Sequence, residues 1–481
     1  MNNIDKTIQK KYPHLEINII NLHEVKKDNK YFRIDSEPFK RSRLLFNKNI
    51  EYIKLSEIAI NPSKNEIYNL DENTQVTFLS MQNLGKGFIN KQEKVIIKDF
   101  IEGYTYFAEN DILIAKITPC MEHGKCAIAR KLYNGIGFGS TEFNVFRIKD
   151  KRFSKEYIFS FLNRENIRQI AADNMVGTSG RQRVSREFYE NLLIPMFSKE
   201  FQLEIEAIVK ESYKALEDSK ALYKEAKNIL NKDLSFDNLT LDKLISIEKY
   251  KNNHLNISIR QFKDSYIKTG RLDAEYYQNK YDIIENIIKG YRKGYCKLIN
   301  IGFFTNGSFI PENFYIEQAK RAYIRIKELS LDSPINIKEC IYINDNFKNS
   351  NETIVKENDF VIATIGNTIG KINLIPKELD GSFISNNTSR FRLMDKNVNP
   401  NFLELLLRSD IVQKQIQREF TQTAQPKISN SSLENIIIPK VDCIIQEKIE
   451  SKIKKSLELR IKSKELLENA ELKIEKAIIE S

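Results

Sequence analysis

The sequence lacks the features that mark membrane and secreted proteins. No uninterrupted apolar run approaches the roughly 18 residues that a membrane-spanning helix needs, although hydrophobic residues make up 41% of the 481-residue chain. The first residues include no apolar segment of the kind that signal peptides carry. The five cysteines show no paired framework. These absences predict a cytoplasmic protein with free thiols.

Sequence motifs for catalysis and cofactor binding are also missing. There is no GxxxxGK loop followed by Ser or Thr, and the glycines of 135–139 do not open a helix, so we expect a turn between strands there. None of the four histidines pairs locally with a Ser or Cys nucleophile. Cys120, His123 and Cys126 lie at three-residue spacing, but a structural zinc site needs four ligands. A metal site is therefore the weaker interpretation, and the sequence predicts neither a metal nor a catalytic set.

The chain is instead duplicated. Four landmarks of the first half return in the second half in the same order, 238 to 248 residues later. The pairs are Arg33–Glu37 with Arg271–Glu275, Tyr52–Leu55 with Tyr295–Leu298, Glu109–Ala115 with Glu357–Ala363, and Asn191–Pro195 with Asn435–Pro439. This period is far too long for a solenoid. Because both copies of the first landmark combine Arg with Asp and Glu, we expect an ion-paired structural turn there.

Each copy reads as a globular region of short strands and helices. Period-two alternation predicts an opening strand in each half, at 16–20 and 255–259. Further strands are expected at 75–81, 112–117, 126–130 and 142–148, and at 360–365, 371–375 and 389–393. Helical stretches are expected at 155–172 and 401–419. Both copies then pass through a basic loop and end in an apolar segment with a proline.

A long helix follows each globular region. Apolar and small residues recur at alternating spacings of four and three between Phe201 and Ile229, with no Gly or Pro between them. A second helix is expected from about 443 to 479. A helix of about 30 residues is about 45 Å long, and two such helices most simply pair antiparallel. The predicted fold class is therefore α+β, with two similar mixed α/β domains separated by two long helices in an antiparallel coiled coil, a pseudo-twofold internal repeat.

The expected boundaries follow from these elements. An N-terminal segment covers 1–49, the first globular domain 50–196, and the first spacer helix 197–232. A linker and the start of the second repeat cover 233–292, the second globular domain 293–440, and the second spacer helix 441–481.

The basic loops at 177–185 and 421–429 are the strongest candidates for a binding site. Arg and Lys can bind phosphates and Gln can bind base edges. The net charge of +11 is compatible with a polyanionic partner, but a Lys-rich composition without binding meaning explains it equally well. That two such loops occupy equivalent places favours the functional interpretation.

The ordered duplication resembles the specificity (S) subunit of type I restriction–modification enzymes. The residues that carry the resemblance are Arg271-Leu272-Asp273-Ala274-Glu275-Tyr276-Tyr277, the loop 177–185 leading to Leu193-Ile194-Pro195, and Gln425-Pro426-Lys427-Ile428-Ser429 leading to Ile437-Ile438-Pro439. The first Arg-Asp-Glu segment departs from the pattern, since Pro38-Phe39 follows it where the second copy has Tyr276-Tyr277.

The resemblance implies two target-recognition domains that each read one half of a split DNA sequence. The expected DNA-binding residues are Ser179, Arg181, Gln182, Arg183, Ser185, Asn387, Thr423, Gln425, Lys427 and Ser429. The helices would dock two methyltransferase subunits through Phe201, Ile205, Ile208, Leu222, Ile449, Ile453, Leu457, Leu467 and Ile474. Restriction (motor-nuclease) subunits would join for cleavage. The chain itself would hold no cofactor, while S-adenosylmethionine, ATP and Mg would act in the partner subunits.

Two other classes of function remain open from the residues alone. The helices could belong to a scaffold whose globular regions bind protein without specific DNA recognition. A weaker alternative is an enzyme with an unrecognised site.

Overall fold

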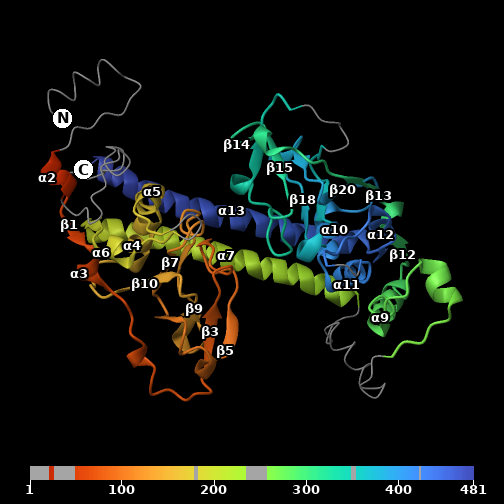
Figure 1. The fold of residues 1–481 in the computed structure, drawn as a ribbon, viewed down its shortest axis with the longest axis horizontal. Coiled ribbons are helices and arrows are strands. Elements are labelled where there is room, and N and C mark those ends of the chain that lie inside the picture. Colours follow the sequence, from red (N-terminus) through yellow and green to blue (C-terminus); the bar gives the residue numbers. More distant parts are fainter. Residues whose placement is uncertain are drawn as a thin grey trace. The chain divides into compact units, whose positions relative to one another are not determined.

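The computed structural model describes residues 21–26, 49–177, 182–234, 257–347, 354–421 and 424–480. The chain divides into two compact units, Met1–Glu217 with Leu459–Ser481, and Asp218–Glu458. The two long helices, α7 (Lys199–Asp233) and α13 (Cys443–Glu480), each contribute residues to both units (Figure 1). Both helices form where the heptad pattern predicts them.

The first unit contains three sheets. Its five-stranded sheet has the order β2-β10-β7-β8-β4, its four-stranded sheet the order β5-β3-β9-β6, and β1 pairs with β11. The strands are β1 (Tyr52–Lys54), β2 (Ala59–Ile60), β3 (Gln75–Leu79), β4 (Lys86–Gly87), β5 (Glu93–Ile96), β6 (Thr105–Ala108), β7 (Ile112–Ala115), β8 (Cys126–Ile128), β9 (Ile136–Gly139), β10 (Phe143–Ile148) and β11 (Leu193–Pro195).

Helices cover the five-stranded sheet of this unit on the side of α7 (Figure 1). They are α3 (Leu55–Ile58), α4 (Lys155–Asn163), α5 (Glu165–Asp173) and α6 (Arg186–Glu190), and a short helix α2 (Leu22–Lys26) lies near the N-terminus. The largest core joins Tyr157 and Phe161 of α4 to Ile205 of α7 and Ile474 of α13. Burial of these side chains, about 25 cal/mol per Å² of apolar surface, attaches the sheet to the helix pair.

The second unit repeats this arrangement. Its sheets have the orders β13-β20-β17-β18 and β14-β16-β15-β19, and β12 pairs with β21. The strands are β12 (Tyr295–Lys297), β13 (Gly302–Asn306), β14 (Tyr315–Ile316), β15 (Arg321–Ile324), β16 (Ile341–Ile343), β17 (Phe360–Ala363), β18 (Ile372–Leu374), β19 (Phe383–Ile384), β20 (Thr388–Leu393) and β21 (Ile437–Pro439). The helices are α9 (Asn279–Lys289), α10 (Pro400–Leu407), α11 (Asp410–Arg418) and α12 (Asn430–Glu434).

The duplication extends to strand pairing. The landmark Tyr52–Leu55 contains β1, which pairs antiparallel with β11, and its copy contains β12, which pairs antiparallel with β21. The antiparallel pair β10–β7 corresponds to β20–β17, and the parallel pair β3–β9 to β15–β19. The units differ at their sheet edges. In the first, β6 pairs with β9 and β4 pairs with β8, whereas in the second β14 pairs with β16 and the sheet of β17 ends at β18. The predicted fold class, two similar mixed α/β domains with two long helices, is thereby confirmed.

Three local predictions need correction. The stretches 155–172 and 401–419 are each two helices, because Arg164 and Ser409 take extended backbone angles. The described part of 255–259 contains no strand, and 16–20 lies outside the described residues. Residues 136–139 form strand β9, where a Cβ at Gly137 would lie 2.1 Å from the ring of Phe107, so this glycine permits close packing within the sheet.

Small polar residues form the contact between α7 and α13. In the first unit the hydroxyl of Ser212 donates to the carbonyl of Ser463 at 2.6 Å, and in the second the hydroxyl of Ser219 donates to the carbonyl of Ser456 at 2.7 Å. All four residues are buried. The first unit also pairs Glu204 with Lys473, and the second pairs Glu225 with Lys452. In each unit, a later residue of α7 therefore meets an earlier residue of α13, so the helices run antiparallel. Short side chains allow the two backbones to approach closely.

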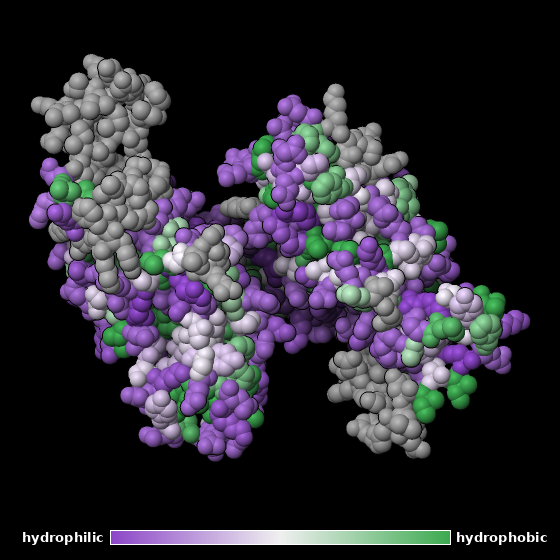
Figure 2. Space-filling model, in the orientation of Figure 1, coloured by the Kyte–Doolittle hydropathy of each residue, from purple (hydrophilic) through white to green (hydrophobic). Residues whose placement is uncertain are grey.

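The visible surface is mostly hydrophilic, with small groups of hydrophobic residues (Figure 2). Among the described residues, no helix is both long and apolar enough to cross a membrane.

Candidate nucleic-acid interface

In the first unit, the basic loop is held against the end of strand β7. Arg183 forms a β-bridge with Ile117. The N–H of Val184 donates to the carbonyl of Lys116 at 2.8 Å, and the N–H of Thr118 donates to the carbonyl of Gln182 at 3.0 Å. The described end of the predicted loop is therefore fixed by backbone hydrogen bonds.

The second unit repeats these contacts bond for bond. Lys427 forms a β-bridge with Ile365. The N–H of Ile428 donates to the carbonyl of Thr364 at 3.1 Å, and that of Gly366 donates to the carbonyl of Pro426 at 2.9 Å. The loops therefore occupy equivalent places, and Arg183 corresponds to Lys427.

A third segment completes each site. The N–H of Lys116 donates to the carbonyl of Glu142, and the N–H of Thr364 donates to the carbonyl of Asn387, both at 3.0 Å. Glu142 and Asn387 each immediately precede the strand that pairs with the end of β7 or β17. Asn387 was expected among the binding residues, whereas its counterpart Glu142 was missed. The strand pairing alone relates the two positions.

The side chains at these equivalent places differ in charge. The Arg183 guanidinium binds both oxygens of Glu142, with Nε–Oε2 at 2.9 Å and Nη2–Oε1 at 2.8 Å. The pair is partly open to solvent, with 45% of the Arg183 side chain and 23% of the Glu142 side chain exposed. Hydrogen bonding to Glu142 raises the pKa of Arg183 above its ordinary value.

At the equivalent place in the second unit, the described residues form no ion pair. Asn387 is neutral and half-buried, and Lys427 is exposed. The N–H of Lys427 donates to Oγ1 of Thr421 at 2.9 Å, which fixes its backbone. One site therefore presents a guanidinium paired with a carboxylate, and the other has Lys427 and the neutral Asn387 at the equivalent positions.

Ser185 and Ser429 have a structural role that is the same in both units. Each is the N-cap of the helix that follows its loop: Ser185 Oγ accepts from the N–H of Phe188 at 3.2 Å, and Ser429 Oγ accepts from the N–H of Ser432 at 3.1 Å. A side-chain cap of this kind stabilises a helix by about 1 kcal/mol. Helix capping accounts for the recurrence of the serine.

The other expected DNA-binding residues are only partly described. Gln182 is half-buried and immediately precedes Arg183, whereas Gln425 is exposed and lies two residues before Lys427. Ser179, Arg181 and Thr423 lie outside the described residues. Contact of any of these side chains with DNA stays a prediction.

The landmarks Glu109–Ala115 and Glu357–Ala363 each contain an aspartate that forms the same ion pair in its unit. Arg147 makes a two-point ion pair with Asp111, and Arg392 makes the same pair with Asp359, at distances of 2.6 to 2.8 Å. Both aspartates are almost fully buried. Each also accepts the N–H of the residue three positions earlier. These ion pairs and hydrogen bonds stabilise the turn before β7 and the turn before β17, which is a structural role.

The Arg-Asp-Glu segment is an ion-paired turn, as expected. Arg271 binds Asp273 through two hydrogen bonds of 2.7 Å and donates to the carbonyl of Phe420 at 2.8 Å. Glu275 accepts from Lys280 and Tyr281. The first copy, 33–37, lies outside the described residues.

The possible metal ligands do not assemble into a site. Among the described residues no three His, Cys, Asp or Glu side chains are grouped to hold a metal. Cys126 is buried, with Sγ 2.9 Å from Oδ1 of Asn163, and burial raises the pKa of its thiol to about 12. Cys126 is therefore a core residue.

The residues expected to dock partner subunits are buried or half-buried within the two units of this chain. Five of them, Ile205, Ile449, Ile453, Leu467 and Ile474, are at most 6% exposed. The other four, Phe201, Ile208, Leu222 and Leu457, are half-buried. Docking by the helices stays a prediction, and it would have to use outward-facing residues such as Leu203, Ile461 and Leu472, each about half exposed.

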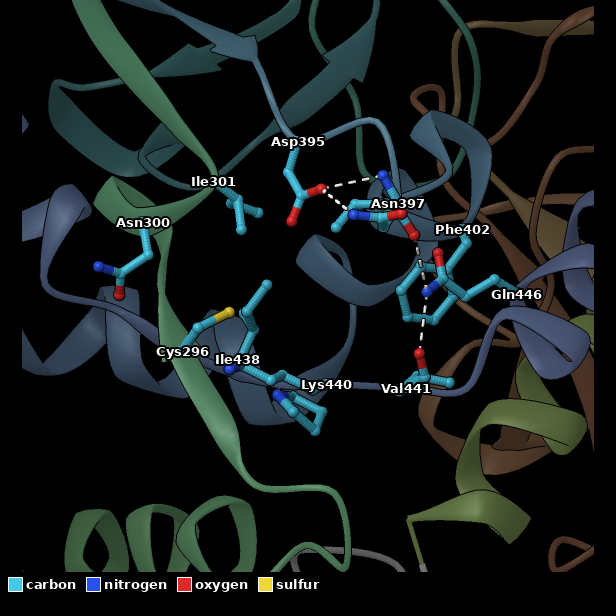
Figure 3. A pocket seen from close by; sticks show the side chains of 12 residues that line it. Cys296, Asn300, Ile301, Asp395, Asn397, Phe402, Ile438, Lys440, Val441 and Gln446 are labelled. Atoms are coloured by element: carbon cyan, nitrogen blue, oxygen red, sulfur yellow. Dashed lines mark hydrogen bonds between the residues drawn. The ribbon is translucent and has the colours of Figure 1, made fainter.

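A cavity of about 280 Å³ lies beside the β12–β21 strand pair (Figure 3). Gln446 closes one side, where its amide donates to the carbonyls of Val441 and Asn397 and its oxygen accepts from the N–H of Asn399. The lining residues are Cys296, Asn300, Ile301, Asp395, Asn397, Val398, Phe402, Ile438, Pro439, Lys440, Val441 and Gln446.

The first unit has the same frame with larger side chains. Gln202 accepts from the N–H of Ser154 and donates to the carbonyl of Phe197, as Gln446 does with Asn399 and Val441. Where the second unit has Val398, Phe402 and Val441, the first has Phe153, Tyr157 and Phe197. The rings of Tyr157 and Phe197 are 6.2 Å apart. The first unit therefore has bulkier side chains at these positions.

Residues 298–473 match the family described as the type I restriction modification DNA specificity domain. Two relatives are from Escherichia coli. The type I restriction enzyme EcoEI specificity subunit is 34% identical over 177 residues, which cover 36% of this chain and 28% of that protein. The EcoAI specificity subunit is 26% identical over 478 residues, which cover 87% of this chain and 79% of that protein.

Two similar solved structures have low sequence identity to this chain. The type I restriction–modification S subunit from M. genitalium is 15% identical, with coverage of 90% and 96% and a TM-score of 0.38. The HsdS subunit from Thermoanaerobacter tengcongensis is 13% identical, with the same coverage and a TM-score of 0.27.

Proposed function

We propose that this chain reads a bipartite, asymmetric DNA sequence, because it belongs to the family of type I restriction–modification specificity subunits. Each unit would read one half of that sequence. The segments around Arg183 and Lys427 would contact the DNA, and the chain would contribute recognition without catalysis.

One observation carries this proposal. Two sites held by equivalent backbone hydrogen bonds present unlike side chains. Arg183 pairs with Glu142 in the first, and Lys427 and Asn387 occupy the equivalent positions in the second. Because the backbones are held in the same way, each unit would present its basic residue to DNA in the same orientation. Because the side chains differ, the two units would recognise different half-site sequences. The overall excess of positive charge suits a phosphate backbone.

The chemistry would belong to partner subunits. Two methyltransferase subunits with S-adenosylmethionine would dock on the long helices and methylate adenine. Motor-nuclease subunits with ATP and Mg would join for restriction. The half-exposed apolar residues on the outer faces of α7 and α13 are available for such contacts.

A protein-binding scaffold is the second candidate, and one surface favours it. Residues 259–272 of the second unit expose Ile259, Phe262, Ile267 and Leu272, each at least 61% exposed. An exposed apolar group of this kind commonly marks a protein interface. A specificity subunit would also need such surfaces, so DNA binding must separate the two functions.

Methylome sequencing of the host, with and without this chain, is the direct test. We expect loss of methylation at one split sequence when the chain is removed. A gel shift with the purified methyltransferase complex should then show retardation of a duplex that carries this sequence. Equal retardation of unrelated duplexes, with an unchanged methylome, would support the scaffold.

A further inference from the structure

We propose that Glu142 positions Arg183 to read a base edge, and that Lys427, with Asn387 in place of Glu142, contacts a phosphate. This assignment rests on the proposed DNA recognition. It divides two equivalent basic residues into a specificity contact and an affinity contact. Two charged residues distinguish the first frame from the second, Glu142 where the second has Asn387 and Lys116 where it has Thr364. The distinction comes from Glu142, the acidic one.

Geometry supports the role of Glu142. Its carboxylate takes the Nε and Nη2 side of the guanidinium in a two-point pair, and two such bonds fix the plane of the fork. The carbonyl of the same residue accepts from Lys116, and Arg183 is bridged to the neighbouring Ile117. Both backbones are therefore anchored to the same strand end, and Arg183 is oriented before any DNA arrives.

Electrostatics then selects what Arg183 can bind. A phosphate that approaches this fork also approaches the Glu142 carboxylate. Like charges a few ångströms apart repel, and they repel more strongly near a protein surface than in bulk water. Guanine offers the neutral acceptors O6 and N7, which do not carry this penalty. The pair therefore disfavours the DNA backbone relative to a base edge.

Lys427 has the opposite setting. Asn387 adds no negative charge where Glu142 stands in the first unit, and the Lys427 ammonium is exposed. Lysine binds phosphate as a point charge and lacks the planar fork that gives arginine its geometric specificity. Contact with a phosphate is the interaction that this site favours.

The test measures DNA affinity against salt concentration for the full chain assembled with its methyltransferase subunits. Each neutralised phosphate contributes about 0.9 to the slope of log affinity against log salt. We expect Lys427→Ala to reduce the slope by about 0.9. We expect Arg183→Ala to leave the slope unchanged and to reduce the preference for the target over single-base variants of its half-site by about tenfold or more.

Glu142→Gln should remove the carboxylate that repels a phosphate from Arg183. The slope should increase by about 0.9, non-specific affinity should rise, and discrimination should fall. Glu122→Gln is the matched control, because Glu122 is an exposed carboxylate nearby and its loss changes net charge equally. We expect a smaller change in slope for this variant.

The reciprocal variant is Asn387→Glu, which places a carboxylate beside Lys427 and should reduce the slope by about 0.9. The assignment is overturned if Arg183→Ala and Lys427→Ala reduce the slope equally, or if Glu142→Gln behaves as Glu122→Gln does. Absence of any preferred sequence for the unaltered protein would instead contradict the proposed function.

Discussion

Glu471 is a carboxylic acid largely enclosed by the first unit. Its Oε1 accepts a hydrogen bond from Asn163. Burial raises the pKa of Glu471 to about 7, although the positive charges of Arg168 and Lys86 oppose this shift. The folded protein therefore binds a proton here at pH values where the unfolded chain has lost it.

This shift predicts a pH dependence of stability. Between about pH 4.5 and pH 7 the folded state holds more protons than the unfolded state, so the free energy of unfolding falls as pH rises. A shift of this size corresponds to a change on the order of 3 kcal/mol. Glu471→Gln keeps the acceptor for Asn163 but cannot ionise, and we expect it to be more stable than the parent at pH 8 and similar at pH 5.

Urea unfolding at pH 5, 6, 7 and 8 measures this difference. The conclusion about Glu471 fails if the gap between variant and parent is the same at every pH.

The cavity beside Val441 permits a second prediction at this scale. Phe197 stands at the equivalent place in the first unit, so Val441→Phe should fill the cavity and raise the free energy of unfolding by about 0.5–2 kcal/mol. Val355 is fully buried elsewhere in the second unit, and Val355→Phe should destabilise by about 1–3 kcal/mol through overpacking. Thermal unfolding distinguishes the two variants, and destabilisation by both would show that the cavity cannot accept a ring.

At the scale of elements, the two long helices follow their heptad pattern closely. Ile205, Ser212, Ser219 and Ala226 are buried on α7, and Ile449, Ser456, Ser463 and Ala470, each 244 residues later, are buried on α13. A strict seven-residue interval keeps one face towards the partner helix. Buried serine pairs specify the register, because a slip would leave their hydroxyls without partners.

Ser219→Leu tests this close approach. The side chain is fully buried and its oxygen lies 3.0 Å from that of Ser456. A larger group must separate the helices, and we expect a loss of about 1–3 kcal/mol in the free energy of unfolding. Asp218→Leu, at an exposed neighbouring position, should change stability by less than about 0.5 kcal/mol. Chemical denaturation checks both, and equal effects would argue against tight packing at Ser219.

Repetition and periodicity are sufficient to predict the long helices, the equivalence of the two loops and seven of the strands, which are β3, β7, β8, β10, β17, β18 and β20. The helix breaks at Arg164 and Ser409 are not visible in the sequence, since neither Gly nor Pro marks them and packing of the following helix decides them. Glu142 was missed for a similar reason. Its partner Arg183 is 41 residues away in sequence, and only the pairing of β7 with β10 brings them together.

At the scale of the whole molecule, the two units share the same strand pairing and ion pairs but differ in the side chains at their basic loops. The ion pairs Arg147–Asp111 and Arg392–Asp359 recur with the same geometry, whereas Glu142 is replaced by Asn387. The ion pair that supports each sheet is retained in both copies, and the side chains at the proposed DNA contacts differ. This division is what two readers of different half-sites require, whereas a symmetric scaffold would have no need of it.

Exchange of residues 50–196 tests the central claim most directly. The segment would be replaced by its counterpart from a specificity subunit of known target, and the chimera expressed with its methyltransferase partners. Methylome sequencing should show that one half of the methylated sequence has changed while the other half is retained. An active chimera that changes both halves, or neither half, would contradict the account.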